Sequence, residues 1–186
     1  TATHTRKGAL LATIDGQDRS RARALSGHVD TLGGMVKEIK KNGRLKFTPI
    51  GGFTMHSVEG EYCSIETSSG AIYTGTLVTL KPSVHVHRDS DKLERIPDNM
   101  EIRLDEMVLS DKDVAALGIE VGDFVHWDPR TTLTRSGFIK SRHLDDKAGV
   151  AIILGAAKYF ASGNIPATTT HRSEEHTSEL QSLSHL

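Results

Sequence analysis

The feature that most constrains the fold of this chain is a long stretch, residues 33–136, in which short strand-like segments follow one another closely. Apolar and polar residues alternate within each segment, and turn-forming residues separate the segments. The segments expected as strands are Met35–Lys40, Leu45–Ile50, Tyr62–Glu66, Ile72–Leu80, Val84–His87, Met100–Leu104 and Phe124–Trp127. Strands at such short spacing are typical of a small barrel or sandwich. We therefore predict an all-β domain in this part of the chain.

Two local signals refine that domain. Asn42-Gly43 separates the first two expected strands and is a strong signal for a two-residue hairpin turn. Ser110, followed by Asp113, is typical of a helix start, and Gly118 is typical of a helix end. A hairpin and one brief helix are therefore expected among the strands.

The segments on either side have a different pattern. Lys7–Ile14 and Ala22–Gly27 are short apolar runs joined by a turn-rich insert, and we expect a hairpin or an adjacent strand pair. A longer helix is expected from about Lys147 to Gly163; it is apolar nearly all round, which favours burial against a sheet. These segments indicate an α/β domain into which the all-β domain is inserted.

The expected organisation is an incomplete α/β domain at residues 1–32 and 137–171, with an inserted β-barrel at residues 33–136. Residues 172–186 are set apart, because Arg172–Ser182 resembles the in-frame translation of a common sequencing adapter. This segment has no apolar periodicity, and an ordinary disordered C-terminus is the alternative. We expect a non-native tail without tertiary packing.

Composition limits the partners and the compartment. The 24 acidic and 23 basic side chains give a net charge of -1, so no field for nucleic acid or an anionic membrane is expected. The longest apolar run, Ala148–Ala157, is too short to span a bilayer. The single cysteine, Cys63, cannot form an internal disulfide, which favours a reducing compartment, the cytoplasm. The chain begins at Thr1 without a signal peptide, which we interpret as a cut end.

His28 and Asp30 are the first candidate site. They are two residues apart at the end of an apolar strand, so both side chains are expected on one face. Sites in open α/β sheets form at this end of a strand. A histidine there can bind a divalent metal while a carboxylate orients it. A solvated strand end without function is the alternative.

Asp145 and Asp146 are the second candidate, between the expected strand Gly137–Lys140 and the long helix. One carboxylate can serve as the N-cap of that helix, and this alone is a sufficient explanation for one of them. Two adjacent carboxylates are more than a cap needs. Asp145 could bridge two metal ions, as in metal-assisted hydrolysis.

Four motifs taken together carry a resemblance to a known family. They are His28-Val-Asp-Thr-Leu-Gly-Gly-Met-Val-Lys-Glu38, Phe47-Thr-Pro-Ile-Gly-Gly52, Gly118-Ile-Glu-Val-Gly-Asp-Phe124 with Asp128-Pro129, and Ser141-Arg-His-Leu-Asp-Asp-Lys-Ala-Gly149. In this order they resemble the cytosolic dinuclear-metal aminopeptidases of peptidase clan MH, family forty-two, which include glutamyl aminopeptidases and TET particles. The resemblance covers residues 5–171. It is closest to the subgroup encoded with synthesis of the osmolyte N-acetylglutaminylglutamine amide.

The resemblance implies a zinc-exopeptidase-like α/β fold and a role for each candidate residue. His28 binds one metal ion, and Asp30 is a catalytic carboxylate that steers the metal site. Asp145 bridges two divalent ions, zinc or cobalt, and its peptide bond to Asp146 is cis. Asp146 and His143 are possible site-lining residues. The implied activity is hydrolysis of N-terminal residues from peptides.

The resemblance also implies what this chain lacks. The family's general base is the first glutamate of a Glu-Glu-Val-Gly motif. Glu174-Glu175 lies near the expected distance, but His176 follows and the pair belongs to the adapter-like segment, so we assign it no role. The remaining ligands are expected beyond this chain. We therefore expect a truncated and nearly inactive enzyme.

Two other functions remain open at this point. One is a metal-dependent deacylase or carboxypeptidase of the same clan, although such relatives carry an α/β lid in place of an all-β insert. The other is a non-catalytic assembly module, because the family's β insert makes subunit contacts and a homo-oligomer is implied. His85 and His87 have metal-ligand spacing but no nearby acidic partner in sequence, so a surface strand is the expected interpretation.

Overall fold

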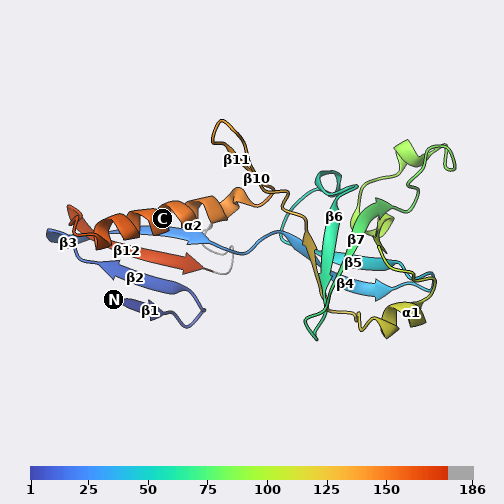
Figure 1. Ribbon diagram of the computed structural model, residues 1–186, viewed down its shortest axis with the longest axis horizontal. Helices are drawn as coiled ribbons and strands as arrows, with labels where there is room; N and C mark the ends of the chain where they lie inside the picture. Colours follow the sequence, from blue (N-terminus) through green and yellow to red (C-terminus); the bar gives the residue numbers. More distant parts are fainter. Residues whose placement is uncertain (176–186) are drawn as a thin grey trace. The chain divides into compact units, whose positions relative to one another are not determined.

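The computed structural model describes the backbone of residues 1–175 and the side chains of residues 1–171. The chain divides into two compact units (Figure 1). One consists of Thr1–Thr31 and Thr131–Leu186, and the other of Leu32–Arg130. The second unit thus lies within the sequence of the first. The mixed α/β fold with a β-barrel agrees with the predicted fold class.

The Leu32–Arg130 unit is a closed antiparallel barrel. Its strands are β4 (Gly33–Ile39), β5 (Leu45–Ile50), β6 (Tyr62–Glu66), β7 (Ile72–Thr79), β8 (Met100–Leu104) and β9 (Phe124–Trp127). They follow the order β4-β5-β8-β7-β6-β9, and β9 closes the barrel by pairing with both β6 and β4. β4 and β5 form the hairpin predicted from Asn42-Gly43, and Gly43 has a φ of 76°, which glycine adopts without a steric cost.

Short helices complete this unit. They are the 3-10 helices η1 (Met55–Ser57), η2 (Ser90–Lys92) and η3 (Pro97–Asn99), and the α-helix α1 (Asp111–Ala116). α1 begins with the predicted capping signal: Ser110 Oγ accepts from the Asp113 N–H at 3.3 Å, and Asp113 Oδ2 accepts from the Ser110 N–H at 2.9 Å.

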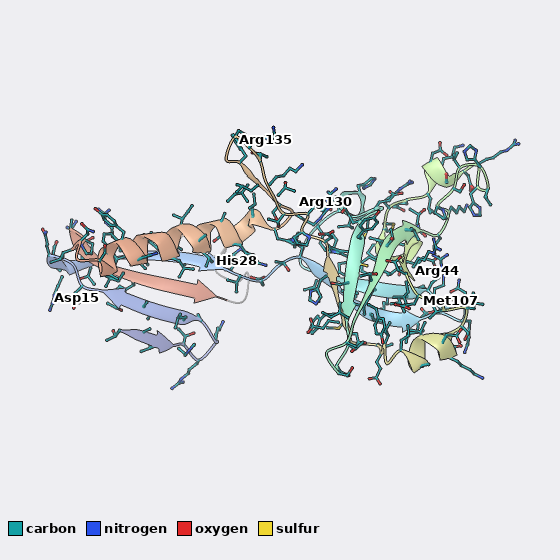
Figure 2. All side chains as sticks on the ribbon, viewed as in Figure 1. Asp15, His28, Arg44, Met107, Arg130 and Arg135 are labelled. Atoms are coloured by element: carbon teal, nitrogen blue, oxygen red, sulfur yellow. The ribbon has the colours of Figure 1, made fainter. Side chains whose placement is uncertain are left out.

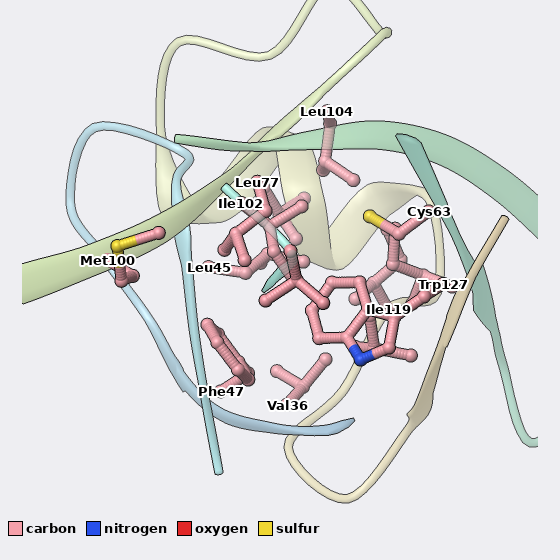
Figure 3. Close-up of a cluster of buried hydrophobic side chains, with 14 of the residues drawn as sticks. Val36, Leu45, Phe47, Cys63, Leu77, Met100, Ile102, Leu104, Ile119 and Trp127 are labelled. Atoms are coloured by element: carbon pink, nitrogen blue, oxygen red, sulfur yellow. The ribbon is translucent and has the colours of Figure 1, made fainter. Parts of the chain in front are cut away.

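The barrel core forms because alternate residues of each strand point inward. Leu45, Leu77 and Ile102 are fully buried there (Figure 3). Ile65 is fully buried in the same core. Trp127 packs edge-on against Phe47, with ring centroids 5.4 Å apart. The packing accounts for the predicted strand pattern over most of this unit.

One predicted barrel strand is wrong. Val84–His87 forms turns, and Val84 and Val86 are 57% and 73% exposed. The alternation there has no core to face, so it carries no strand. His85 and His87 lie in this turn segment of the barrel unit.

The other unit is an open sheet with one long helix. Its strands are β1 (Ala2–His4), β2 (Leu10–Ile14), β12 (Thr168–Glu175) and β3 (Asp18–His28), in that spatial order, and β10 (Thr132–Leu133) pairs with β11 (Ile139–Lys140) separately. The predicted adjacency of the first two long strands is wrong, because β12 lies between β2 and β3. β12 is antiparallel to β2 and parallel to β3. Local patterns identify strands but do not identify a later strand that enters between them.

Helix α2 (Leu144–Ala161) lies along one face of this sheet (Figure 1). Val150 and Ile153 are buried, whereas Ile152 and Tyr159 are 73% and 60% exposed. The prediction of a buried helix therefore holds for one side of α2 only, because the described residues cover only that side. No helix of the described residues is long and apolar enough to span a membrane.

The expectation that the tail takes no part in the fold is wrong for its first four residues. Arg172–Glu175 continues β12, and Glu174 and Glu175 pair in register with Gly27 and His28 of β3. The physical reason is that strand pairing uses backbone groups, which every residue here supplies once Thr168–His171 has set the register. Residues 176–186 lie outside the described part of the chain. The non-native origin of the tail stays a prediction.

Candidate metal centre

The structure brings His28, Asp30 and Asp145 together. His28 ends β3 (Figure 2), and Asp30 lies two residues further on, in the segment that follows the strand. Asp30 Oδ1 lies 2.8 Å from His28 Nδ1, and Asp145 Oδ1 lies 3.0 Å from His28 Nε2. A carboxylate only accepts, so a ring nitrogen of His28 donates to its carboxylate whenever that nitrogen carries a proton. The two nitrogens of one imidazole thus each contact a different carboxylate, one from 117 residues further along the chain.

Asp145 and Asp146 precede the regular part of α2. Both have non-helical backbone angles, so regular helix begins at Lys147, as predicted. The bond between them is cis, as the resemblance implies. Asp146 Oδ1 accepts from the Gly149 N–H at 3.2 Å, which is the N-cap contact of a helix starting at Lys147. The cap interpretation therefore holds for Asp146, and Asp145 is left to face His28.

The electrostatics of His28 follow from this arrangement. Partial burial disfavours the charged ring, but the hydrogen bonds and negative charges of Asp30 and Asp145 outweigh it, so the pKa of His28 is raised above its usual value. The side chain of His28 is 22% exposed and that of Asp145 is 82% exposed. The site is therefore open on the side of Asp145.

The donor set suits a zinc-type metal. Imidazole nitrogen and carboxylate oxygen are both common zinc ligands, and a carboxylate on the other ring nitrogen fixes the tautomer of a ligating histidine. His28 Nε2 and Asp145 supply two such donors, with Asp30 in the supporting position. Among the described residues, no group of three or more His, Cys, Asp or Glu side chains is arranged to hold an ion. The described part of the chain thus offers two candidate donors here, His28 Nε2 and an Asp145 oxygen.

The remaining candidates have other places. His143 lies directly before α2 and is buried, and its backbone N–H donates to Ser141 Oγ at 3.4 Å. Gly27, which the sequence patterns did not single out, is buried beside the carboxylate of Asp146. A glycine within a strand, directly before the candidate histidine, was the available signal, because such a glycine marks a close approach of another group.

The chain is similar to known aminopeptidases. The profile of the M42 glutamyl aminopeptidase family matches residues 8–174. A protein named as a candidate aminopeptidase, YhfE of Bacillus subtilis, is 63% identical over 148 residues, which are 80% of this chain and 43% of that protein.

Two solved structures share the fold. An aminopeptidase from the archaeon Desulfurococcus kamchatkensis has a TM-score of 0.80 at 21% identity, covering 97% of this chain and 47% of that one. The TET1 peptidase of Pyrococcus horikoshii, described as assembling into a tetrahedron or a large octahedral shell, has a TM-score of 0.74 at 20% identity, covering 94% and 50%.

The chain shares with these two structures an α/β fold that carries a barrel. The chain belongs to the M42 glutamyl aminopeptidase family, a family of metal-dependent peptidases. It spans less than half the length of the B. subtilis relative.

Proposed function

We propose that this chain carries part of the dinuclear metal centre of an aminopeptidase that removes N-terminal residues from peptides. One observation carries the proposal: the imidazole of His28 lies between Asp30 and Asp145, with 2.8 and 3.0 Å contacts. Family membership supports an aminopeptidase over a deacylase or carboxypeptidase of the same clan.

In this proposal, His28 Nε2 and Asp145 hold metal, and Asp146 caps the helix behind them. Two bound zinc or cobalt ions would supply Lewis acidity for hydrolysis of the peptide bond. Asp30 keeps a proton on His28 Nδ1, which leaves Nε2 as the ligating nitrogen. Asp145 is the most exposed of the three side chains, so it is suited to face more than one ion.

The test compares activity between proteins of different length. Aminoacyl p-nitroanilides with zinc or cobalt should be hydrolysed by the product of the uninterrupted reading frame. The 186-residue chain should be nearly inactive, because the two candidate ligands among the described residues leave most coordination positions to water. In the longer protein, His28→Ala and Asp145→Asn should each abolish turnover, whereas Asp15→Asn, at the opposite end of the sheet (Figure 2), should not. Comparable turnover by the 186-residue chain would contradict the proposal.

We further propose that the inserted barrel mediates contacts between copies of the longer protein in a homo-oligomer. The TET1 relative is described as forming large assemblies, which supports the idea. Sedimentation of the longer protein, with and without the Leu32–Arg130 unit, tests it.

We also propose that the protein resides in the reducing cytoplasm. The observation that supports this is the free thiol of Cys63, which is buried in the barrel core.

Two narrower proposals concern the gene. The Ser141–Gly149 motif supports membership of the subgroup linked to N-acetylglutaminylglutamine amide synthesis, which is tested by identifying neighbouring genes. The adapter-like string Arg172–Ser182 supports a non-native tail. Resequencing the genomic locus past His171 tests it, and recovery of the same codons would disprove it.

A further inference from the structure

We propose that Asp146 is a positioning residue: its carboxylate, seated between Gly27 and Gly149, holds Asp145 beside His28. The inference rests on the proposed function in assigning His28 and Asp145 to a metal. It goes beyond that function in giving Asp146 a task other than lining the site or capping the helix. Three observations support it.

The first observation is the space around the Asp146 carboxylate. A Cβ added at Gly149 would overlap that carboxylate, and one added at Gly27 would lie 2.9 Å from Asp146 Oδ2 and 3.0 Å from Val150 Cγ2. Two residues far apart in the sequence therefore both need hydrogen in place of a side chain. Together they form a cradle, defined by Gly27 and Gly149, that the Asp146 carboxylate fills.

The second observation is the position of the cradle in the chain. Gly27 directly precedes His28 at the end of β3, and Asp146 directly follows Asp145. The carboxylate of Asp146 thus lies beside Gly27, the residue before His28. Through its backbone, Asp146 is also bonded directly to Asp145. Movement of Asp146 out of the cradle would separate Asp145 from His28, because their neighbours would no longer be in contact.

The third observation is the weak support that Asp145 receives elsewhere. Its side chain is 82% exposed, and its contact within the described residues is the 3.0 Å one to His28 Nε2. An exposed side chain with one hydrogen bond is not held by packing. The position of the Asp145 backbone must therefore be fixed by its neighbours in the chain. Asp146, which is anchored by its hydrogen bond from the Gly149 N–H, is the neighbour that fixes it.

Three substitutions separate positioning from simple helix capping. Asp146→Ser keeps an N-cap oxygen but is too short to fill the cradle. Asp146→Asn keeps both the cap oxygen and the shape, and is the conservative rescue. Gly27→Ala narrows the cradle from the β3 side and leaves Asp146 intact. Asp15→Ser, at the other end of the sheet, is the matched control.

The first readout needs no metal. The ring ¹⁵N signals of His28, identified by their loss in His28→Ala, are recorded in the 186-residue chain, and Asp145→Ala gives the spectrum of the broken contact. We expect Asp146→Ser and Gly27→Ala to resemble Asp145→Ala at His28 Nε2, and Asp146→Asn and Asp15→Ser to resemble the parent chain. Circular dichroism checks that α2 is retained. If Asp146→Ser does not fold, the pair Gly27→Ala and Asp146→Asn still decides the outcome.

The second readout is zinc titration followed at the same signals. The apparent Kd should rise about tenfold in Asp146→Ser and Gly27→Ala and change less than about twofold in Asp146→Asn. Parent-like His28 spectra in Asp146→Ser and Gly27→Ala would overturn the positioning role. If zinc moves no His28 signal in the parent chain, the proposed metal site fails, and the metal-free spectra still decide the role of Asp146.

Discussion

The barrel and the α/β unit are built from similar local patterns, but they bury very different amounts of apolar surface. Of 18 buried hydrophobic side chains among the described residues, 15 form the barrel core. The α/β unit has the other three, Ala9, Val150 and Ile153. The difference arises because the inner faces of a closed barrel meet one another, whereas an open sheet is covered only where a helix lies on it.

The site lies in the thinly packed α/β unit. His28, Asp145 and Asp146 are positioned by hydrogen bonds and by close approach at glycine rather than by a deep core. We therefore expect perturbations of packing to act mainly on the barrel, and small polar or glycine substitutions to act mainly on the site.

The largest expected effect concerns the reactivity of Cys63 in the barrel core. Burial, with a smaller contribution from the charge of Asp105, raises the pKa of this thiol to about 12. The thiolate population at pH 8 is then about a thousandfold below that of an ordinary cysteine. Labelling with a thiol reagent should be slowed by at least about that factor relative to the same chain in urea. Rapid labelling of the folded chain would show that the barrel opens readily.

The same shift has a consequence at high pH. The folded thiol keeps its proton to about pH 12, whereas the unfolded thiol, with an ordinary pKa of 9.0, loses it near pH 9. The stability contribution of Cys63 is therefore fully present below pH 9 and is lost as the pH rises from 9 toward 12. Cys63→Ala should remove this part of the alkaline dependence in urea titrations, while other alkaline titrations remain.

Two isoleucines of the barrel unit, one buried and one exposed, test how much burial contributes to the free energy of unfolding. Ile102 is fully buried and Ile72, on the adjacent strand, is 65% exposed. Ile102→Ala should lower the free energy of unfolding by about 2–5 kcal/mol, and Ile72→Ala by less than about 1 kcal/mol. Trp127, the one tryptophan, reports barrel unfolding in urea by its fluorescence. Equal losses for the two variants would contradict a core confined to the barrel interior.

Neighbouring isoleucines of α2 make the same test in the α/β unit. Ile153 is buried and Ile152 is exposed. Ile153→Ala should cost about 1–2 kcal/mol, less than in the barrel because fewer groups surround it, and Ile152→Ala should cost less than about 0.5 kcal/mol. Amide hydrogen exchange of α2 measures both. A similar loss for Ile152→Ala would show that both sides of α2 are covered.

The sequence predicts the barrel better than the sheet, for a physical reason. An antiparallel barrel is made largely of neighbouring segments, so alternation and Asn42-Gly43 are sufficient to indicate strands and one hairpin. The same alternation at Val84–His87 has no core to face and forms turns. β12 enters between β2 and β3 from far along the chain, and no local pattern contains that information.

At the site, spacing and resemblance indicate His28, Asp30 and Asp145, and these three side chains lie together. Their roles as metal ligands and catalytic carboxylate remain predictions. Residue patterns alone do not indicate which of Asp145 and Asp146 caps the helix and which faces His28. That assignment depends on which carboxylate accepts from the Gly149 N–H and on the space beside Gly27, and both depend on the three-dimensional structure.

The smallest expected effects contrast an ion pair in each unit. In the barrel, Lys40 Nζ donates to Glu101 Oε2 at 2.6 Å, and the Glu101 side chain is only 10% exposed. Lys40→Met leaves that carboxylate buried with the more distant Arg44, at 3.8 Å, so we expect a loss of about 1–2 kcal/mol by Trp127 fluorescence in urea.

In the α/β unit, Arg19 and Asp15 are 3.4 Å apart and both largely exposed, so Arg19→Met should change hydrogen exchange of β3 by less than about 0.5 kcal/mol. The double variant Lys40→Met with Glu101→Met should recover most of the barrel loss, because it removes the buried charge along with its partner. A loss for Lys40→Met no larger than that for Arg19→Met would mean that Glu101 is solvated. The difference in burial between the barrel and the α/β unit would then hold for apolar side chains but not for charged ones.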